Sequence, residues 1–326
     1  MNHFKSSIII AVIGLGIAFL LGGITALYIT SLLAILEISL SFDNAVVNAK
    51  ILDTMEPKWQ ERFITFGLPI AIFGMRFLFP LIIVAIAGNI GIIETFNLAL
   101  NEPHKYQEIL EKTITLIYAF GGAFLLMVFL DFLFDIDRQE KWFNLLEGNS
   151  IITKASEIDS IEMIIGSAIG IYLTYLTNDY KIAIAYFSGI LLHSIIASID
   201  TLLNTNGVRS GIMGLIYLEI LDASFSFDGV IGAFALSTNI FIIMIGLGIG
   251  AMFVRSLTLY LVEKKTLTEY RYLEHGAHYA IIALAIIMLI EIFYKVNEII
   301  TGSIGIGFIA AAFIHSIIKN KQELKK

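Results

Sequence analysis

The chain has 326 residues, of which 57% are hydrophobic and 15% are charged, and its mean hydropathy is +0.84. This composition excludes an ordinary soluble domain and indicates an integral membrane protein. A net charge of −7 argues against nucleic-acid binding, and the absence of cysteine excludes disulfides and thiolate metal sites. A metal would therefore have to bind oxygen or imidazole ligands.

Ten apolar segments are candidates for membrane-crossing helices, which need about 20 residues each. In chain order they are 6–22, 24–49, 63–88, 114–134, 160–177, 182–203, 212–236, 240–262, 278–294 and 300–318. Segments 160–177 and 278–294 are short, so we expect eight to ten helices. The predicted fold class is an all-α, polytopic membrane bundle.

The first apolar run follows Lys5 and is about 17 residues long, so a cleaved signal peptide is an alternative to a retained helix. No small-x-small cleavage site follows the run, which favours retention. Fifteen of the 21 Lys and Arg residues fall on one side of the predicted topology, the side of both termini and of loops 50–62, 135–159, 204–211 and 263–277. The positive-inside rule then places both termini in the cytoplasm.

One acidic motif occurs twice, as Leu36–Asp43 in predicted helix 24–49 and as Leu221–Asp228 in predicted helix 212–236. Five of the eight aligned positions are identical, and Glu37 aligns with Asp222. Because the copies lie on the second and seventh helices, the two motifs are expected to run through the membrane in opposite directions. This pattern is typical of transporters built from inverted repeats, which bind substrate where the repeats meet.

The predicted organisation follows from this duplication. Residues 1–134 form the first repeat, 135–159 a cytoplasmic connection, and 160–326 a linking helix and the second repeat. On a regular helix Glu37, Ser41, Asn44 and Asn48 share one polar face, and Asp43 points about 120° away from it. We therefore expect the motif helix to be interrupted at Ser-Phe-Asp, so that freed carbonyls line a cavity.

Carboxylates are costly inside a membrane, so a duplicated acidic set indicates a function, and we infer cation binding. The candidate ligands are Asp43, Asp228, Glu37, Asp222, Glu219, Asn44, Ser41 and Ser226. Oxygen ligands of this kind suit manganese, calcium or magnesium, and manganese and calcium cannot be separated on this basis. The divalent ion is expected as a substrate, with no other cofactor.

Arg76 and Arg255 lie in predicted helices and are expected to pair with the motif acids as supporting charges. Five motif acids against two arginines leave an excess of about three negative charges, which a cation or protons would neutralise. The alternative is that these pairs only fasten helices together.

His275 and His278 begin the ninth helix and are accessory candidates. They are interpreted either as interfacial histidines or as a proton relay or accessory ligands. The glycines of 246–250 are expected to allow close helix packing. The sequence shows no nucleophile–base pair and no zinc triad, so we expect no enzyme activity.

The stretch from Leu36 to Val46 resembles the TerC family of integral membrane proteins, whose hallmark is an acidic residue followed by Ser-x-Asp-Asn. It is most similar to a branch catalogued as a domain of unknown function. Further stretches that fit this branch are 73–76, 120–127, 218–229 and 272–279, so the similarity covers nearly the whole chain. The second motif departs from the hallmark with Gly229 in place of Asn and with the additional Glu219.

The resemblance implies a multi-pass protein of the inner membrane, within a superfamily of amino-acid and cation exporters. TerC relatives are associated with manganese export and tellurium resistance, and related families with calcium and manganese exchange. The expected function is export of a divalent cation, manganese in preference to calcium, exchanged for protons that clustered carboxylates release. The alternative is a membrane scaffold in a stress or tellurite-resistance complex, and the expected partners are lipids, the ion, and either further copies of the chain or stress-complex proteins.

Overall fold

The computed structural model describes residues 4–135, 138, 140–143, 146–203, 211–212, 214–216, 218–220, 222, 233, 236–237, 239–265, 269–296 and 298–323. All regular secondary structure in these ranges is helical, which confirms the predicted all-α class. Six of the described helices are long and apolar enough to cross a membrane, namely Lys5–Ile38, Pro103–Phe134, Tyr180–Ser198, Ile240–Glu263, Leu273–Glu291 and Ser303–Glu323. The apolar helices indicate a multi-pass membrane protein.

The chain divides into two compact units, and each combines two separate stretches of sequence. The first unit contains residues 1–117 and 202–264, and the second contains 118–201 and 265–326. The first unit therefore draws on both predicted repeats, and it contains the described residues of both motif copies.

The first unit contains a series of helices from the N-terminal part of the chain and one long helix from its C-terminal half. These helices are α1 (Lys5–Leu40), α2 (Phe42–Asp53), α3 (Pro57–Pro69), η1 (Ile70–Leu78), α4 (Phe79–Ala87), α5 (Ile92–Asn101) and α11 (Ile240–Glu263). Helix α6 (Pro103–Phe134) begins in the first unit and ends in the second.

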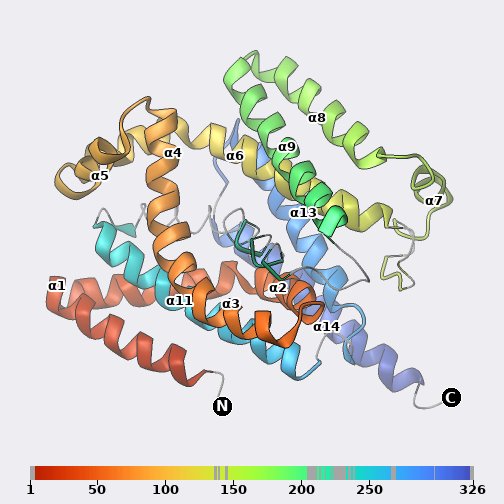
Figure 1. The fold of residues 1–326 in the computed structure, drawn as a ribbon, viewed down its shortest axis with the longest axis horizontal. Coiled ribbons are helices and arrows are strands. Elements are labelled where there is room, and N and C mark those ends of the chain that lie inside the picture. Colours follow the sequence, from red (N-terminus) through yellow and green to blue (C-terminus); the bar gives the residue numbers. More distant parts are fainter. Residues whose placement is uncertain are drawn as a thin grey trace. The chain divides into compact units, whose positions relative to one another are not determined.

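Helix α1 is sharply kinked between two arms, and α11 packs against both of them (Figure 1). At Gly23 the backbone has φ +65° and ψ −152°, a conformation that essentially only glycine adopts. Ser7 on the first arm donates a hydrogen bond to the Met252 carbonyl at 3.0 Å. On the second arm, Leu33 lies so close to Gly246 that a Cβ at Gly246 would be 2.6 Å from the Leu33 Cβ. The predicted boundary between 6–22 and 24–49 is thus present as this kink.

The motif helix is interrupted at Ser41, within the predicted Ser-Phe-Asp stretch, but the Glu37 and Ser41 carbonyls still accept from the N–H groups of Ser41 and Ala45 at 3.0 and 3.3 Å, so the interruption does not free these two carbonyls as predicted. Helix α1 ends at Leu40 and α2 begins at Phe42, and the intervening Ser41 has φ −103° and ψ 17°. The predicted helix 63–88 is a continuous helical run made of α3, η1 and α4, but its centre is a π-helix of nine residues. Such wide turns are rare and occur frequently at functional sites.

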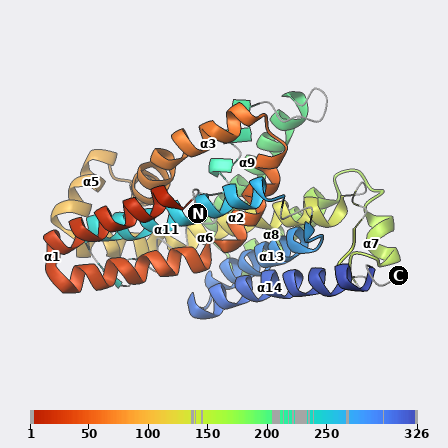
Figure 2. The same cartoon turned by 90° about the horizontal axis from the view of Figure 1, so that it is seen from below.

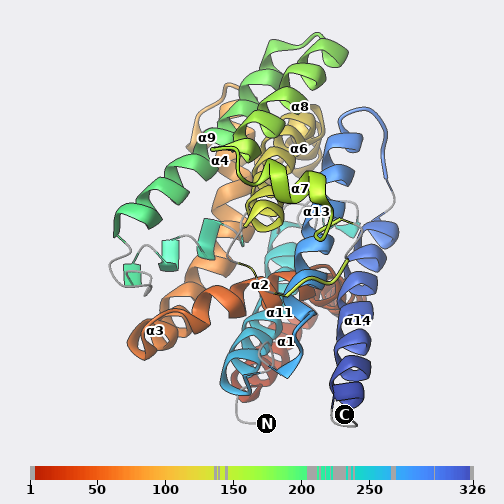
Figure 3. The same ribbon diagram turned by 90° about the vertical axis from the view of Figure 1, so that its right-hand side faces the viewer.

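The second unit is built around the C-terminal part of α6. Its further helices are α7 (Ser150–Ala155), α8 (Ile161–Thr177), α9 (Tyr180–Leu203), α13 (Leu273–Glu291) and α14 (Glu298–Glu323). Helices α8 and α9 form a hairpin (Figure 3), closed by a 2.9 Å hydrogen bond from the Tyr186 hydroxyl to the Gly166 carbonyl. Helices α13 and α14 lie side by side (Figure 2), and a Cβ at Gly276 would meet the side chain of Ala312.

The largest differences from the predicted helices lie in segment 89–113, which was predicted as a polar connection. The segment instead contains α5 and the first turns of α6. Pro103 is tolerated at the start of α6, because the first N–H groups of a helix have no partner within the helix and proline lacks only this group. Helix α13 begins at Leu273, five residues before the predicted start at 278. Between 211 and 236, the residues that the structure describes are helical, and the rest of predicted helix 212–236 lies outside the described residues.

Candidate functional site

The candidate site in the first unit is a buried network of three carboxylates and two arginines, which we call the acid–arginine network. Its described members are Glu37, Asp222, Glu219, Arg76 and Arg255. Each side chain is at most 9% exposed.

Arg76 joins the two copies of the motif. Its Nη2 lies 2.5 Å from Oε1 of Glu37, and its Nη1 lies 3.1 Å from Oδ2 of Asp222. Glu37 and Asp222 are the corresponding acids of the two copies, so one guanidinium binds both. The π-helix η1 holds the backbone of Arg76. This arrangement confirms the expected pairing of Arg76 with motif carboxylates.

Arg255 forms the second part of the network from helix α11. Its Nη2 donates to Oε1 of Glu219 at 3.1 Å, and its Nη1 donates to the Phe63 carbonyl at 2.6 Å. The guanidinium carbon lies 4.1 Å from the centre of the Phe63 ring, which adds a cation–π contact. The carbonyl and the ring of Phe63 are partners that the sequence did not suggest, because no local pattern links residues 192 positions apart.

Local packing fixes the position of Glu37. The Ser41 hydroxyl donates a 3.1 Å hydrogen bond to Oε1 of Glu37, one helical turn away. On the opposite helix, a Cβ at Gly250 would collide with the Cβ and Cγ atoms of Glu37. Gly250 thus provides the space for the carboxylate stem, which agrees with the expected role of glycines 246–250 in close helix packing.

The structure describes part of the predicted ligand set. Asn44 is buried in α2, and the backbone of Asp43 is helical, but the Asp43 side chain lies outside the described part. Asp228 and Ser226 also lie outside the described residues. Among the side chains that are described, no group of three His, Asp or Glu residues is arranged to hold a metal ion. The network therefore shows how the arginines hold Glu37, Asp222 and Glu219.

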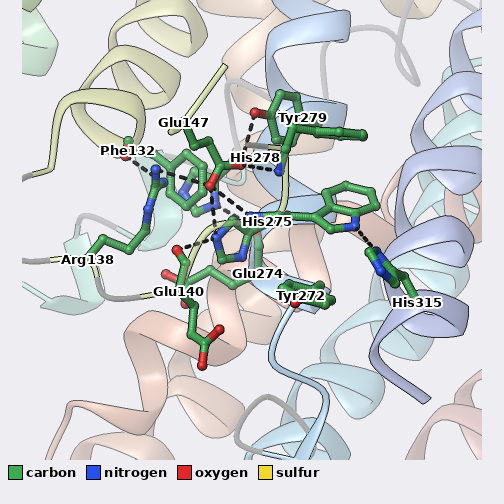
Figure 4. A network of polar contacts seen from close by, with 12 residues as sticks. Phe132, Arg138, Glu140, Glu147, Tyr272, Glu274, His275, His278, Tyr279 and His315 are labelled. Atoms are coloured by element: carbon green, nitrogen blue, oxygen red, sulfur yellow. Dashed lines mark hydrogen bonds and ion pairs between the residues drawn. The ribbon is translucent and has the colours of Figure 1, made fainter. Parts of the chain in front are cut away.

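A second polar network lies in the second unit and surrounds Glu147 (Figure 4). The Oε1 atom of Glu147 accepts from the Tyr279 hydroxyl at 3.0 Å, and Oε2 accepts from the Trp142 backbone N–H at 3.1 Å. Nε2 of His275 lies 3.3 Å from Oε2, and Nη2 of Arg138 lies 3.4 Å from the same oxygen. Burial raises the pKa of Glu147, but the contacts with His275, the Trp142 N–H and Arg138 outweigh it, so the net pKa is below the ordinary value.

The accessory histidines find their partners within this second network. Nε2 of His275 donates to the Glu140 carbonyl at 3.0 Å, and Nδ1 of His278 donates to the Glu274 carbonyl at 2.9 Å. The His278 ring stacks on Phe132 with 3.9 Å between ring centres. Sequence reasoning did not single out Glu147, because its partners on α13 lie more than 120 residues away and the residue itself sits in a loop.

Further contacts place the connection after α6, the start of α13 and the end of α14 together at one end of the second unit. Arg271 forms ion pairs with Glu323 and, at 3.5 Å, with Glu140. Nε1 of Trp142 donates to Nδ1 of His315 at 2.8 Å. Three segments that are distant in the sequence are therefore held together by polar contacts.

Comparison with protein families gives a match over residues 42–323 to a family described as "Protein of unknown function (DUF475)". The chain belongs to this family. No curated protein and no solved structure matches the DUF475 chain. The matched stretch includes the second motif copy, the two network arginines and the Glu147 network, but only Phe42 and Asp43 of the first motif copy.

Proposed function

We propose that this DUF475 protein is a secondary transporter that exports a divalent metal cation, with manganese favoured over calcium as the substrate. The observation that carries the proposal is the binding of Arg76 to Glu37 and Asp222, the corresponding acids of the two motif copies. Buried ionisable groups in membrane helices are costly and mark ion pathways by default. The TerC-like hallmark at Glu37–Asn44 supports the same class of substrate.

In this proposal the two motif copies belong to inverted repeats and share one cation site. Asp43 and Asp228 are the core ligands, and the remaining motif acids, Asn44, Ser41 and Ser226 add oxygen atoms or accept protons. Arg76 and Arg255 neutralise carboxylates while no substrate is bound, which lowers the cost of an uncompensated buried charge. Clustered carboxylates bind either protons or metal, so export is coupled to proton entry.

The test is divalent cation flux in proteoliposomes that contain the purified chain. We expect Asp43→Asn and Asp228→Asn to insert and fold as the wild type does but to abolish manganese flux. Asp53→Asn is the matched control, because Asp53 is an exposed acid in the same helix as Asp43. Wild-type flux in both motif variants would contradict the proposal.

A membrane scaffold of a stress or tellurite-resistance complex is the second candidate. It is favoured by the fact that each described carboxylate of the acid–arginine network already contacts an arginine, as helix fastening requires. Thermal unfolding with manganese, calcium or magnesium separates the two candidates. A transporter is stabilised in a saturable manner by its substrate ion, whereas a scaffold gains no stability from any of the three.

A further inference from the structure

A small cavity adjoins the acid–arginine network inside the first unit. It has a volume of about 10 Å³ and is lined by Asn48, Phe63, Asp222, Ala251, Val254, Arg255 and Thr258. A cavity of about this volume holds one water molecule. A single small ion without its hydration shell therefore also fits.

Two oxygen atoms around the cavity remain able to bind a ligand. Asn48 is 3% exposed, and its Oδ1 atom has no hydrogen-bond partner among the described residues. Thr258 is fully buried and donates its hydroxyl proton to the Val254 carbonyl at 3.0 Å, which leaves the oxygen lone pairs available. A buried acceptor without a donor is costly, so such an atom beside a cavity points to a water molecule or an ion as its partner.

The charge of the surroundings indicates what this occupant is. The described members of the acid–arginine network are three carboxylates and two arginines, which together carry one net negative charge, and this count leaves out Asp43 and Asp228, whose side chains lie outside the described part. A water molecule would satisfy Asn48 but would not offset negative charge. A divalent ion takes six or more oxygen ligands or keeps bound waters, and a cavity of this volume has no room for them. One monovalent cation gives the oxygen atoms a partner and offsets one negative charge.

We propose that this cavity binds one dehydrated monovalent cation of the size of Na⁺, through Asn48, Thr258 and the carboxylate of Asp222. A hard cation of this kind takes oxygen ligands, which all three side chains provide. The proposal does not depend on the proposed function, because it requires neither divalent binding nor transport, although Asp222 belongs to both sites. The ion offsets one negative charge of the acid–arginine network while the arginines remain paired.

The experiment measures thermal unfolding of the purified full-length chain in NaCl and in choline chloride at equal ionic strength, with a chelator to remove divalent ions. We expect Na⁺ to raise the unfolding temperature in a saturable manner and choline to have no such effect. KCl and a pH series without Na⁺ are measured in parallel, and an equal stabilisation by K⁺ or by acidification alone would overturn the assignment to an ion of the size of Na⁺. Equal curves in Na⁺ and choline would mean that the cavity holds water only and would overturn the proposal.

Two variants locate the effect in the cavity. Asn48→Leu and Thr258→Val remove one ligand oxygen each with little change in volume, and each should weaken the apparent affinity for Na⁺ at least tenfold. If Asn48→Leu does not fold, the Na⁺ affinity of Thr258→Val alone tests the assignment. Thr30→Val is the matched control, because Thr30 is a fully buried threonine of the same unit that does not line the cavity. Unchanged Na⁺ affinity in Thr258→Val would contradict the assignment.

Discussion

The two buried networks of this DUF475 protein use carboxylates in different ways. Glu147 in the second unit accepts hydrogen bonds from a tyrosine and a backbone N–H and forms ion pairs with a histidine and an arginine, so both of its oxygen atoms are satisfied. In the first unit, the Oε2 atom of Glu219 and the Oδ1 atom of Asn48 have no hydrogen-bond partner among the described residues, and Asn48 lines a small cavity. A satisfied carboxylate fastens a loop, whereas incomplete satisfaction next to free space indicates a ligand site.

The largest expected effect tests the first network. Arg76→Met leaves Glu37 and Asp222 buried without their shared counter-ion, so we expect a loss of about 3–5 kcal/mol in the free energy of unfolding. Chemical denaturation in detergent measures it. Adding Glu37→Gln should restore part of the loss, and Lys58→Met, a change at an exposed lysine, is the control. If Arg76→Met lowers the free energy of unfolding by less than the control does, the pairing contributes no stability.

The second prediction tests whether Glu147 is structural. Glu147→Ala leaves Arg138, His275 and the Trp142 N–H without their acceptor, so we expect a loss of about 3 kcal/mol. The measurement is the same denaturation experiment, combined with protease cleavage in segment 138–149. Glu140→Ala, at an exposed carboxylate of the same segment, is the control. Folded Glu147→Ala protein should still carry divalent flux. A folded variant without flux would contradict a purely structural role of Glu147.

A third prediction concerns the kink that allows both arms of α1 to contact α11. Gly23→Ala forces a Cβ into a backbone conformation with φ +65°, which should cost about 1–3 kcal/mol. Gly16→Ala is the matched control, since Gly16 is helical with open space around it and the change should be neutral or slightly stabilising. Thermal unfolding compares the two. Equal stability of the two variants would mean that the kink tolerates a side chain.

The smallest expected effect is the pH dependence of the Glu147 network. The pKa of Glu147 is lowered in the folded chain, so its contribution to stability is present above the ordinary glutamate pKa and is lost as the pH falls through the lowered value. Unfolding measured from pH 7 to pH 3 should therefore show a smaller difference between wild type and Glu147→Gln at the acidic end. A difference that grows on acidification contradicts the stated direction.

Sequence reasoning was most successful where the signal was local or duplicated. The repeated motif and the two arginines within apolar predicted helices led to the pairs of Arg76 and Arg255, and the glycine pair led to the kink of α1. The break of the motif helix at Ser41 followed from a mismatch between the polar faces. These features depend on residue spacing, which a sequence displays directly.

Other features depend on contacts between distant residues and could not be predicted. Segment 89–113 was interpreted as a loop because it is polar, although a polar composition also suits helices outside the hydrocarbon core. The π-helix η1 has no signature in its apolar sequence. The role of Glu147 depends on residues brought to it by the tertiary fold.

The wide helical turns around Arg76 have a consequence for movement. A π-helix holds more residues per turn than an α-helix, so tightening η1 to α geometry rotates everything after it about the helix axis without breaking the chain. Because Arg76 lies within η1, such a rotation would change the direction of its guanidinium relative to Glu37 and Asp222. The nine residues of η1 thus lie where a change in helical geometry would alter the pairing of Arg76 with the motif carboxylates.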